Sequence, residues 1–206
     1  MCPVGAGSTG APITPARILD AAARLFRQHG YEATRTRELA AALGVQKGSL
    51  YYYVEKKEDI LFEICLESLR RLQEAVDAAL RESDDPERRL LLLITTHTTS
   101  ILRDRDLHAT MLLELRSLSG ERRRTVVAQR DAYEQGVRRI VGEAQEAGVL
   151  REDVDARQLT FALFNLMNWT VTWFRPQRAP ALTPPEFADL LASIFLDGAR
   201  GPRPQP

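Results

Sequence analysis

The stretch TRELAAALGVQKGSLYYY, residues 36–53, decides the fold of the first part of this chain. It predicts a helix that begins at Thr36, a stop at Gly44 and a second short helix from about Lys47 to Tyr53. Two short helices joined by a tight turn that contains glycine are typical of a helix-turn-helix. The pattern therefore indicates a DNA-binding unit whose second helix enters the groove.

The second helix carries side chains that suit contact with nucleic acid. A cation and hydroxyl groups bind phosphates, and tyrosine rings reach base edges. All three lysines of the chain, Lys47, Lys56 and Lys57, lie within eleven residues around three consecutive tyrosines. Residues 14–60 hold eight basic and six acidic side chains, although the whole chain has no net charge. A local basic excess is compatible with DNA binding even in a neutral protein.

Helical periodicity extends outward from this motif in both directions. Thr14 and Pro15 predict the start of a helix that Gly30 ends. After the motif, amphipathic patterns predict helices at residues 57–80, 87–102, 107–118, 121–146, 156–174 and 185–199, with no strand and no internal repeat. We expect an all-α fold with disordered tails at 1–13 and 200–206, a three-helix DNA-binding domain at 14–60 and a larger helical bundle at 61–199.

Composition excludes several classes of protein. The chain has 206 residues, 44% of them hydrophobic and 27% charged, which is ordinary for a globular protein. Two cysteines form no disulfide framework, and no apolar run reaches the roughly 18 residues of a membrane span. We therefore expect a cytoplasmic protein without membrane contact. His97 and His108 lack zinc-site spacing, and no phosphate loop or elbow serine is present, so we expect no metal, no cofactor and no enzymatic activity.

The first 60 residues resemble the amino-terminal domain of TetR-family repressors. The resemblance rests on Ile18-Leu19-Asp20-Ala21-Ala22, on Leu25-Phe26, Gly30-Tyr31 and Ala33-Thr34, and on the helix-turn-helix through Lys57-Glu58. It implies a homodimer that binds a palindromic operator in double-stranded DNA, and a helical body that binds a small effector and forms the dimer. The fold class is then a three-helix helix-turn-helix domain followed by a helical-bundle ligand-binding and dimerisation domain.

The motif and the resemblance together predict the DNA contacts. The residues expected at DNA are Thr36, Arg37, Gln46, Lys47, Gly48, Ser49, Tyr51, Tyr52 and Lys57, whereas Tyr53 is expected to be structural. The chain departs from the family pattern at three places: Val54 replaces an aromatic plug, Lys56 a capping serine and Gln46 a serine. The cap of the fourth helix must therefore be made in another way.

Residues 161–176 are the most unusual stretch of the body. Both tryptophans lie here, four residues apart, and therefore share one helical face. Asn165, Asn168, Thr172 and Arg175 form a polar stripe along the same predicted helix. Buried polar groups need partners, so the stripe lines either a ligand pocket or a symmetric dimer interface. The broad apolar faces expected to pair in the dimer hold Leu159, Leu163, Leu166, Phe187, Leu190, Leu191, Ile194 and Phe195.

The stretch also resembles TetR regulators that respond to acyl-CoA thioesters of fatty-acid or sterol degradation. This resemblance implies a small hydrophobic effector, an acyl-CoA, with basic residues near its phosphates. The predicted ligand-binding residues are His97, Met111, Arg116, Phe164, Asn165, Asn168, Trp169, Thr172, Trp173 and Arg175. Two alternatives stay open: a drug-sensing regulator of an efflux pump, in which Glu114 or Glu143 would face a cation, and a helical scaffold that does not bind DNA.

Overall fold

The computed structural model describes residues 13–174 and 182–200, except for the side chain of Lys47. These residues form helices and no strand; Leu150 and Arg200 make one isolated bridge. The all-α prediction is confirmed. In chain order the elements are α1 (Pro15–His29), α2 (Thr36–Leu43), α3 (Lys47–Tyr51), α4 (Lys57–Leu80), α5 (Pro86–Arg103), α6 (Arg105–Glu114), a 3-10 turn (Leu115–Ser117), α7 (Gly120–Glu146), α8 (Ala156–Asn168), α9 (Thr170–Trp173) and α10 (Pro184–Ala199).

Local signals explain where the first helices begin and end. The Thr14 hydroxyl accepts a hydrogen bond from the backbone N–H of Arg17, with 3.3 Å between the atoms, and Pro15 follows in the first turn. Gly30 and Gly44 end α1 and α2 with φ values of +85° and +71°. Residues with a side chain rarely adopt such angles, so both predicted glycine stops are confirmed.

The start of α4 replaces the missing serine cap with a carboxylate. Asp59 Oδ2 accepts a hydrogen bond from the backbone N–H of Lys56, with a distance of 2.8 Å. Glu58 accepts two more bonds from Ser119, one from its backbone N–H and one from its hydroxyl, both at 2.9 Å. These bonds lower the pKa of Glu58. The first turn of α4 is therefore fixed both by its own residues and by the segment that precedes α7.

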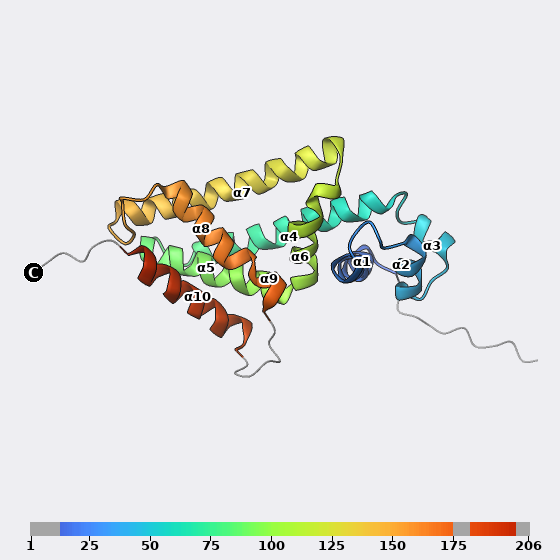
Figure 1. Cartoon of the computed structure of the whole chain (residues 1–206), viewed down its shortest axis with the longest axis horizontal. Coiled ribbons are helices and arrows are strands. Elements are labelled where there is room, and N and C mark those ends of the chain that lie inside the picture. Colours follow the sequence, from blue (N-terminus) through green and yellow to red (C-terminus); the bar gives the residue numbers. More distant parts are fainter. Residues whose placement is uncertain (1–12, 175–181, 201–206) are drawn as a thin grey trace, which may run out of the picture.

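The helices divide the elongated molecule into two ends (Figure 1). The helices α1, α2 and α3 lie at one end, and α5, α7, α8 and α10 form the bundle at the other. The 24 residues of α4 extend for roughly 36 Å and join the two ends. The helix α6 packs against both α1 and α4.

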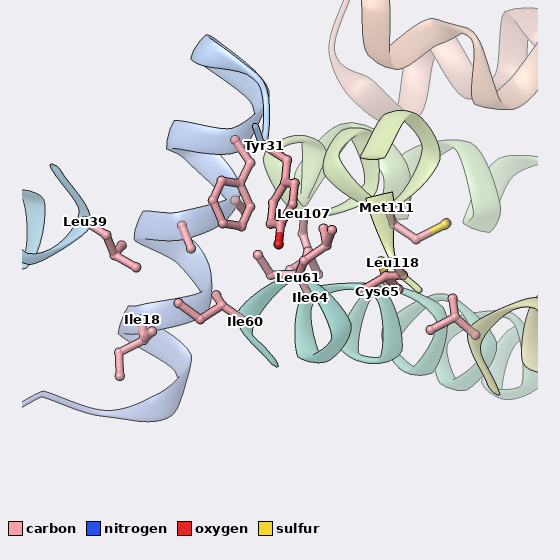
Figure 2. Close-up of a cluster of buried hydrophobic side chains, with 14 of the residues drawn as sticks. Ile18, Tyr31, Leu39, Ile60, Leu61, Ile64, Cys65, Leu107, Met111 and Leu118 are labelled. Atoms are coloured by element: carbon pink, nitrogen blue, oxygen red, sulfur yellow. The ribbon is translucent and has the colours of Figure 1, made fainter. Parts of the chain in front are cut away.

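The first hydrophobic core extends beyond the DNA-binding helices, as Figure 2 shows. Phe26 and Tyr31 meet edge to face, with ring centroids 5.2 Å apart. Around them pack Leu61 and Ile64 from α4 and Leu107 from α6. Three short helices cannot bury a sizeable core alone, and here the core crosses residue 60 into α4, α6 and the start of α7.

The second core fills the bundle. It contains buried side chains from α4, α5, α7, α8 and α10, including Leu72, Leu93, Val141, Leu163 and Leu196. The helix α4 contributes to both cores, so the predicted double role of the fourth helix is confirmed.

Two predicted helices end earlier than expected. The helix predicted over 107–118 stops at Glu114 and continues as a 3-10 turn. The helix predicted over 156–174 breaks at Trp169, because threonine hydroxyls occupy the carbonyls there. Thr170 donates to the Met167 carbonyl at 2.6 Å, and Thr172 donates to the Trp169 carbonyl at 2.7 Å. Such local bonds compete with the helical ladder.

Candidate nucleic-acid interface and cavity

The recognition helix α3 presents its tyrosines to solvent. The exposed fractions are 45% for Tyr51, 88% for Tyr52 and 48% for Tyr53. Leu50 is fully buried in the first core, and Val45 and Val54 on either side of α3 pack against that core. The rings of Tyr51 and Tyr52 therefore stand where a duplex can reach them. Tyr53, expected to be structural, is as exposed as Tyr51.

Positive charge around α3 is not neutralised by the protein. Arg35, Arg37 and Lys56 are exposed and form no ion pair with any described residue. The nearby carboxylates Glu58 and Asp59 are both occupied by Arg122 of α7. The local excess of cations is therefore available to phosphates, which supply most of the affinity in DNA complexes.

Other predicted contact residues occupy the same surface. The Thr36 hydroxyl lies 3.4 Å from the Tyr51 hydroxyl and links the start of α2 to α3. Gln46 and Ser49 are exposed. A side-chain carbon added at Gly48 would meet nothing within 4 Å, so the backbone there is open to approach. The side chain of Lys47 lies outside the described part of the chain.

Lys57 differs from the other predicted contact residues, because its ammonium already has partners within the protein. Its ammonium donates hydrogen bonds to the carbonyls of Tyr31, Glu32 and Thr34, at 2.7, 3.3 and 3.1 Å. It also lies 4.2 Å from the centre of the Tyr31 ring. An ammonium group has three hydrogens, and all three are used here. Lys57 therefore ties the loop after α1 to the start of α4, and a DNA contact by Lys57 stays a prediction that requires these bonds to open.

A cavity of about 400 Å³ lies in the body, between α4, α5, α6, α7 and α8. This volume lies within the range of roughly 300–1,000 Å³ of small-molecule sites. Its lining is mostly apolar, with neutral polar groups, one basic side chain and one acidic side chain among the described residues. The lining residues are Leu69, Leu72, His97, Ile101, His108, Met111, Leu112, Arg130, Tyr133, Glu134, Phe161, Phe164, Asn165, Asn168 and Trp169.

A buried hydrogen-bonded chain crosses one wall of the cavity. His97 Nδ1 lies 2.8 Å from the Tyr133 hydroxyl, and His97 Nε2 lies 2.8 Å from Asn168 Oδ1. Burial lowers the pKa of His97 to about 4 and raises that of Tyr133. The neutral imidazole therefore donates from Nε2 to the Asn168 oxygen and accepts at Nδ1 from the Tyr133 hydroxyl. This tautomer satisfies both ring nitrogens of His97, the Tyr133 hydroxyl hydrogen and the Asn168 oxygen.

His108 stands on the opposite helix, α6. Its Nδ1 lies 2.8 Å from the Ser68 hydroxyl of α4. Its Nε2 is buried and has no hydrogen-bond partner in the part of the chain that the structure describes. Burial lowers the pKa of His108 to about 4, so this ring is also neutral near pH 7.

The structure brings together six of the ten predicted ligand-binding residues. His97, Met111, Phe164, Asn165, Asn168 and Trp169 line the cavity. Arg116 is exposed on the 3-10 turn, and neither Thr172 nor Trp173 lines the cavity, because the break at Trp169 turns α9 away from the line of α8. Trp173 instead packs edge-on against Phe187, with ring centroids 5.5 Å apart. Arg175 lies outside the described residues.

Sequence reasoning missed Tyr133 and His108 as cavity residues, and also the charged side chains of Arg130 and Glu134. Tyr133 shares the buried face of α7 with Val126 and Val137, which marks it as internal but not as a hydrogen-bond partner. Only the arrangement of the helices places its hydroxyl at His97.

The helix α6 contacts both the cavity and the DNA-binding domain. His108 and Met111 line the cavity. Between them, the buried Thr110 hydroxyl donates to the Ala23 carbonyl of α1 at 3.0 Å. Asp106, at the start of the same helix, pairs with Arg27 of α1. A shift of α6 would therefore move α1.

The outer surface of the bundle carries large apolar side chains. Exposed there are Phe161, Trp169, Trp173, Leu190 and Ile194. Fewer of the apolar residues predicted for a dimer interface are available to a partner than expected. Five of them are buried within the chain itself: Leu159, Leu163, Phe187, Leu191 and Phe195.

Neither a metal centre nor a membrane span appears in the described ranges. Residues 13–174 and 182–200 hold no group of three or more histidine, cysteine, aspartate or glutamate side chains that would bind a metal ion. No helix in those ranges is long and apolar enough to cross a membrane.

Comparison with known proteins agrees with this geometry. Residues 18–64 match the family described as bacterial regulatory proteins, tetR family. Residues 83–199 match the tetracyclin repressor-like C-terminal domain. The chain is 30% identical over 190 residues to the HTH-type transcriptional repressor KstR2 of Rhodococcus jostii, and the match covers 90% of each chain.

Two further proteins are similar. The fatty acid metabolism regulator protein of Bacillus subtilis is 28% identical over 156 residues, which are 76% of this chain and 80% of the relative. The crystal structure of AibR in complex with isovaleryl coenzyme A and operator DNA superposes with a TM-score of 0.78 at 27% identity, covering 87% of this chain and 96% of that one. The chain therefore belongs to the TetR family of transcription regulators.

Proposed function

We propose that this protein is a dimeric repressor that binds a palindromic operator and is released by a small hydrophobic effector. Exposed Tyr51 and Tyr52, with the unpaired cations Arg35, Arg37 and Lys56, supply groups for base edges and phosphates. A twofold dimer would present two copies of α3 about one helical turn apart on the DNA. The named relative KstR2 is a transcriptional repressor.

The proposed dimer pairs the outer faces of α8 and α10. Leu190 and Ile194 are exposed on α10, and Phe161 is exposed on α8. A contiguous apolar patch on a soluble protein is typical of an interaction site, and a twofold axis lets the same patch serve both partners.

The dual contact of α6 carries the proposal of ligand-induced release. Its His108 and Met111 line the cavity, while Thr110 binds α1. A ligand that fills the cavity and moves α6 would change the position of α1 and, through the shared core, of α3. If the ligand prefers the released form about 100-fold, the coupling is about 3 kcal/mol.

An acyl-CoA is the proposed effector class. The cavity wall is mainly apolar, which suits an acyl chain. One relative is named a regulator of fatty acid metabolism, and AibR was crystallised with isovaleryl coenzyme A. A cationic drug is less well supported, because Glu134 is the one carboxylate among the described lining residues. Glu143 pairs with Arg89 instead, and Glu114 is not a lining residue.

The test is operator binding by the full chain as a function of salt and ligand. If each protomer neutralises about four phosphates, log K falls with log salt with a slope of about −7. Decanoyl-CoA should then lower the operator affinity about 100-fold at constant salt. A flat salt dependence would contradict DNA contact by the α3 surface, and an unchanged affinity with every acyl-CoA tested would contradict the effector class.

A further inference from the structure

One buried ring nitrogen of His108, Nε2, lacks a hydrogen-bond partner among the described residues. His108 is fully buried, lines the cavity, and makes one side-chain hydrogen bond among the described residues, between its Nδ1 and the Ser68 hydroxyl, which lie 2.8 Å apart. A buried polar group without a partner costs about 1–3 kcal/mol, so proteins rarely keep one without a use.

The hydrogen count identifies this nitrogen as a donor. The Ser68 hydroxyl has no other partner among the described residues, so its hydrogen is satisfied only if it points to His108 Nδ1. The neutral ring then carries its own hydrogen on Nε2. The opposite assignment would leave two groups unsatisfied, the Ser68 hydrogen and the Nε2 lone pair. The first assignment leaves fewer groups unsatisfied and is therefore favoured. In it, the Nε2–H group of His108 needs an acceptor.

A second donor lines the same cavity. Asn168 Oδ1 accepts the hydrogen bond from His97 Nε2. The Asn168 amide nitrogen then keeps two hydrogens, and no acceptor for them occurs among the described residues. Both groups are donors; Asn168 is half-buried, whereas His108 Nε2 is fully buried and is the group that requires a ligand oxygen as its acceptor.

The charge of the cavity lining determines whether the ligand oxygen belongs to a charged carboxylate or to a neutral carbonyl group. Burial lowers the pKa of His97 and His108 to about 4, so neither ring offers a positive charge near pH 7. The one cation in the described lining, Arg130, is exposed and paired with Asp131 at 2.9 Å. A buried carboxylate without a cation is costly, whereas a carbonyl oxygen accepts hydrogen bonds without carrying charge.

We propose that the cavity selects ligands by a neutral carbonyl oxygen, that of a thioester, ester or ketone, which accepts a hydrogen bond from His108 Nε2. A free carboxylic acid is excluded as a ligand of this site. The inference rests on the proposed effector role of the cavity and specifies the chemical group that the cavity recognises. His108 is a ligand-binding residue in this account.

The experiment compares three probes on the full-length protein at pH 7.5 by calorimetry. S-decanoyl-N-acetylcysteamine is a neutral thioester, S-decyl-N-acetylcysteamine is the thioether without that carbonyl, and decanoate is the free acid. The thioester should bind about 5- to 10-fold more tightly than the thioether, as expected for one hydrogen bond. Decanoate should bind at least about tenfold more weakly than the thioester.

Two matched variants assign the effect to the nitrogen. His108→Asn retains an amide near the Nδ1 position but lacks the distal donor, so the advantage of the thioester over the thioether should vanish. His108→Gln carries an amide to the Nε2 position and should keep part of it. Thioether affinity should be similar in both. Infrared spectra of the ¹³C-carbonyl thioester bound to wild-type protein give a test that needs no variant, because a hydrogen-bonded carbonyl absorbs at lower wavenumber.

The outcomes separate the two proposals. Equal binding of thioester and thioether, an unshifted carbonyl band, or preference for decanoate would overturn the carbonyl inference and leave the hydrophobic effector in place. Equal loss in the Asn and Gln variants would remove the role of Nε2. If no probe binds, the effector proposal fails and this inference fails with it.

Discussion

At the DNA-binding end Tyr52 is almost fully exposed, whereas at the cavity end His97 and His108 are completely enclosed. The DNA-binding end presents charged side chains and tyrosine hydroxyls that are exposed to water and lie close together in the sequence. The cavity end offers neutral donors and acceptors contributed by helices far apart in the sequence, such as Ser68 with His108 and His97 with Tyr133. Affinity for a charged polymer needs accessible charge, and selectivity for a small ligand needs buried groups that are costly to leave unpaired.

The largest expected contrast is in the response to pH. Burial lowers the pKa of both histidines from 6.5 to about 4, so between these values the unfolded chain binds more protons than the folded one. The contribution of the two neutral histidines to the free energy of unfolding should therefore be fully present above about pH 6.5 and be lost as the pH drops toward 4. The loss should be on the order of 1 kcal/mol per histidine per pH unit. Urea unfolding at pH 6.5, 5.5 and 4.5 measures it.

The control for that prediction is His108→Gln, which removes one of the two titrations. Its stability should fall less steeply with pH, by the share of one histidine, about 1 kcal/mol per pH unit, since carboxylates such as Glu67 titrate alike in both proteins. An unchanged slope would mean that His108 is not held neutral by burial.

The second prediction asks whether the two ends fold together. Leu61 is fully buried in the core that α1, α4 and α6 share. Leu61→Ala should destabilise the protein by about 3 kcal/mol. Both tryptophans lie in the body, so their fluorescence should shift to lower urea in parallel with circular dichroism. A fluorescence transition that stays in place would show that the DNA-binding helices unfold independently.

The third prediction concerns base recognition. Tyr52→Ala should reduce discrimination between operator and unrelated DNA by about 1–3 kcal/mol, because it removes a ring and a hydroxyl from the groove-facing helix. Thioester binding should not change, since the cavity lies at the other end. Tyr52→Phe separates the ring from the hydroxyl. Competition binding measures all three proteins, and unchanged discrimination in Tyr52→Ala would place the recognition surface elsewhere.

The smallest expected effect tests the link between the ends. Thr110→Val keeps the shape of the side chain and removes its bond to the Ala23 carbonyl. The ligand-induced loss of operator affinity should shrink by about fivefold, equivalent to about 1 kcal/mol. Thr125→Val, which removes a similar bond to the Glu121 carbonyl within α7, is the matched control. Equal effects in both variants would contradict a specific role for α6.

The two ends also differ in how far the sequence predicts them. The helix-turn-helix depends on local signals, the stops at Gly30 and Gly44 and the inward Leu50, and these were predictable. The cavity chain from Tyr133 through His97 to Asn168 was not, because which polar groups meet depends on the packing of α5, α7 and α8. The break at Trp169 was missed for a different reason: no glycine or proline marks it, and threonine hydroxyls take the carbonyls instead. Lys57 shows a second limit of local signals, since the resemblance places it at DNA and gives no sign of the three carbonyls that its ammonium binds inside the protein.

The most direct test of the account is the affinity of decanoyl-CoA for the free protein and for the same protein saturated with operator. Coupling between two sites is reciprocal, so a ligand that weakens operator binding about 100-fold must itself bind about 100-fold more weakly to the operator complex. That difference is the predicted result. Equal affinity for the free and the operator-bound protein would contradict communication from the cavity to the recognition helix.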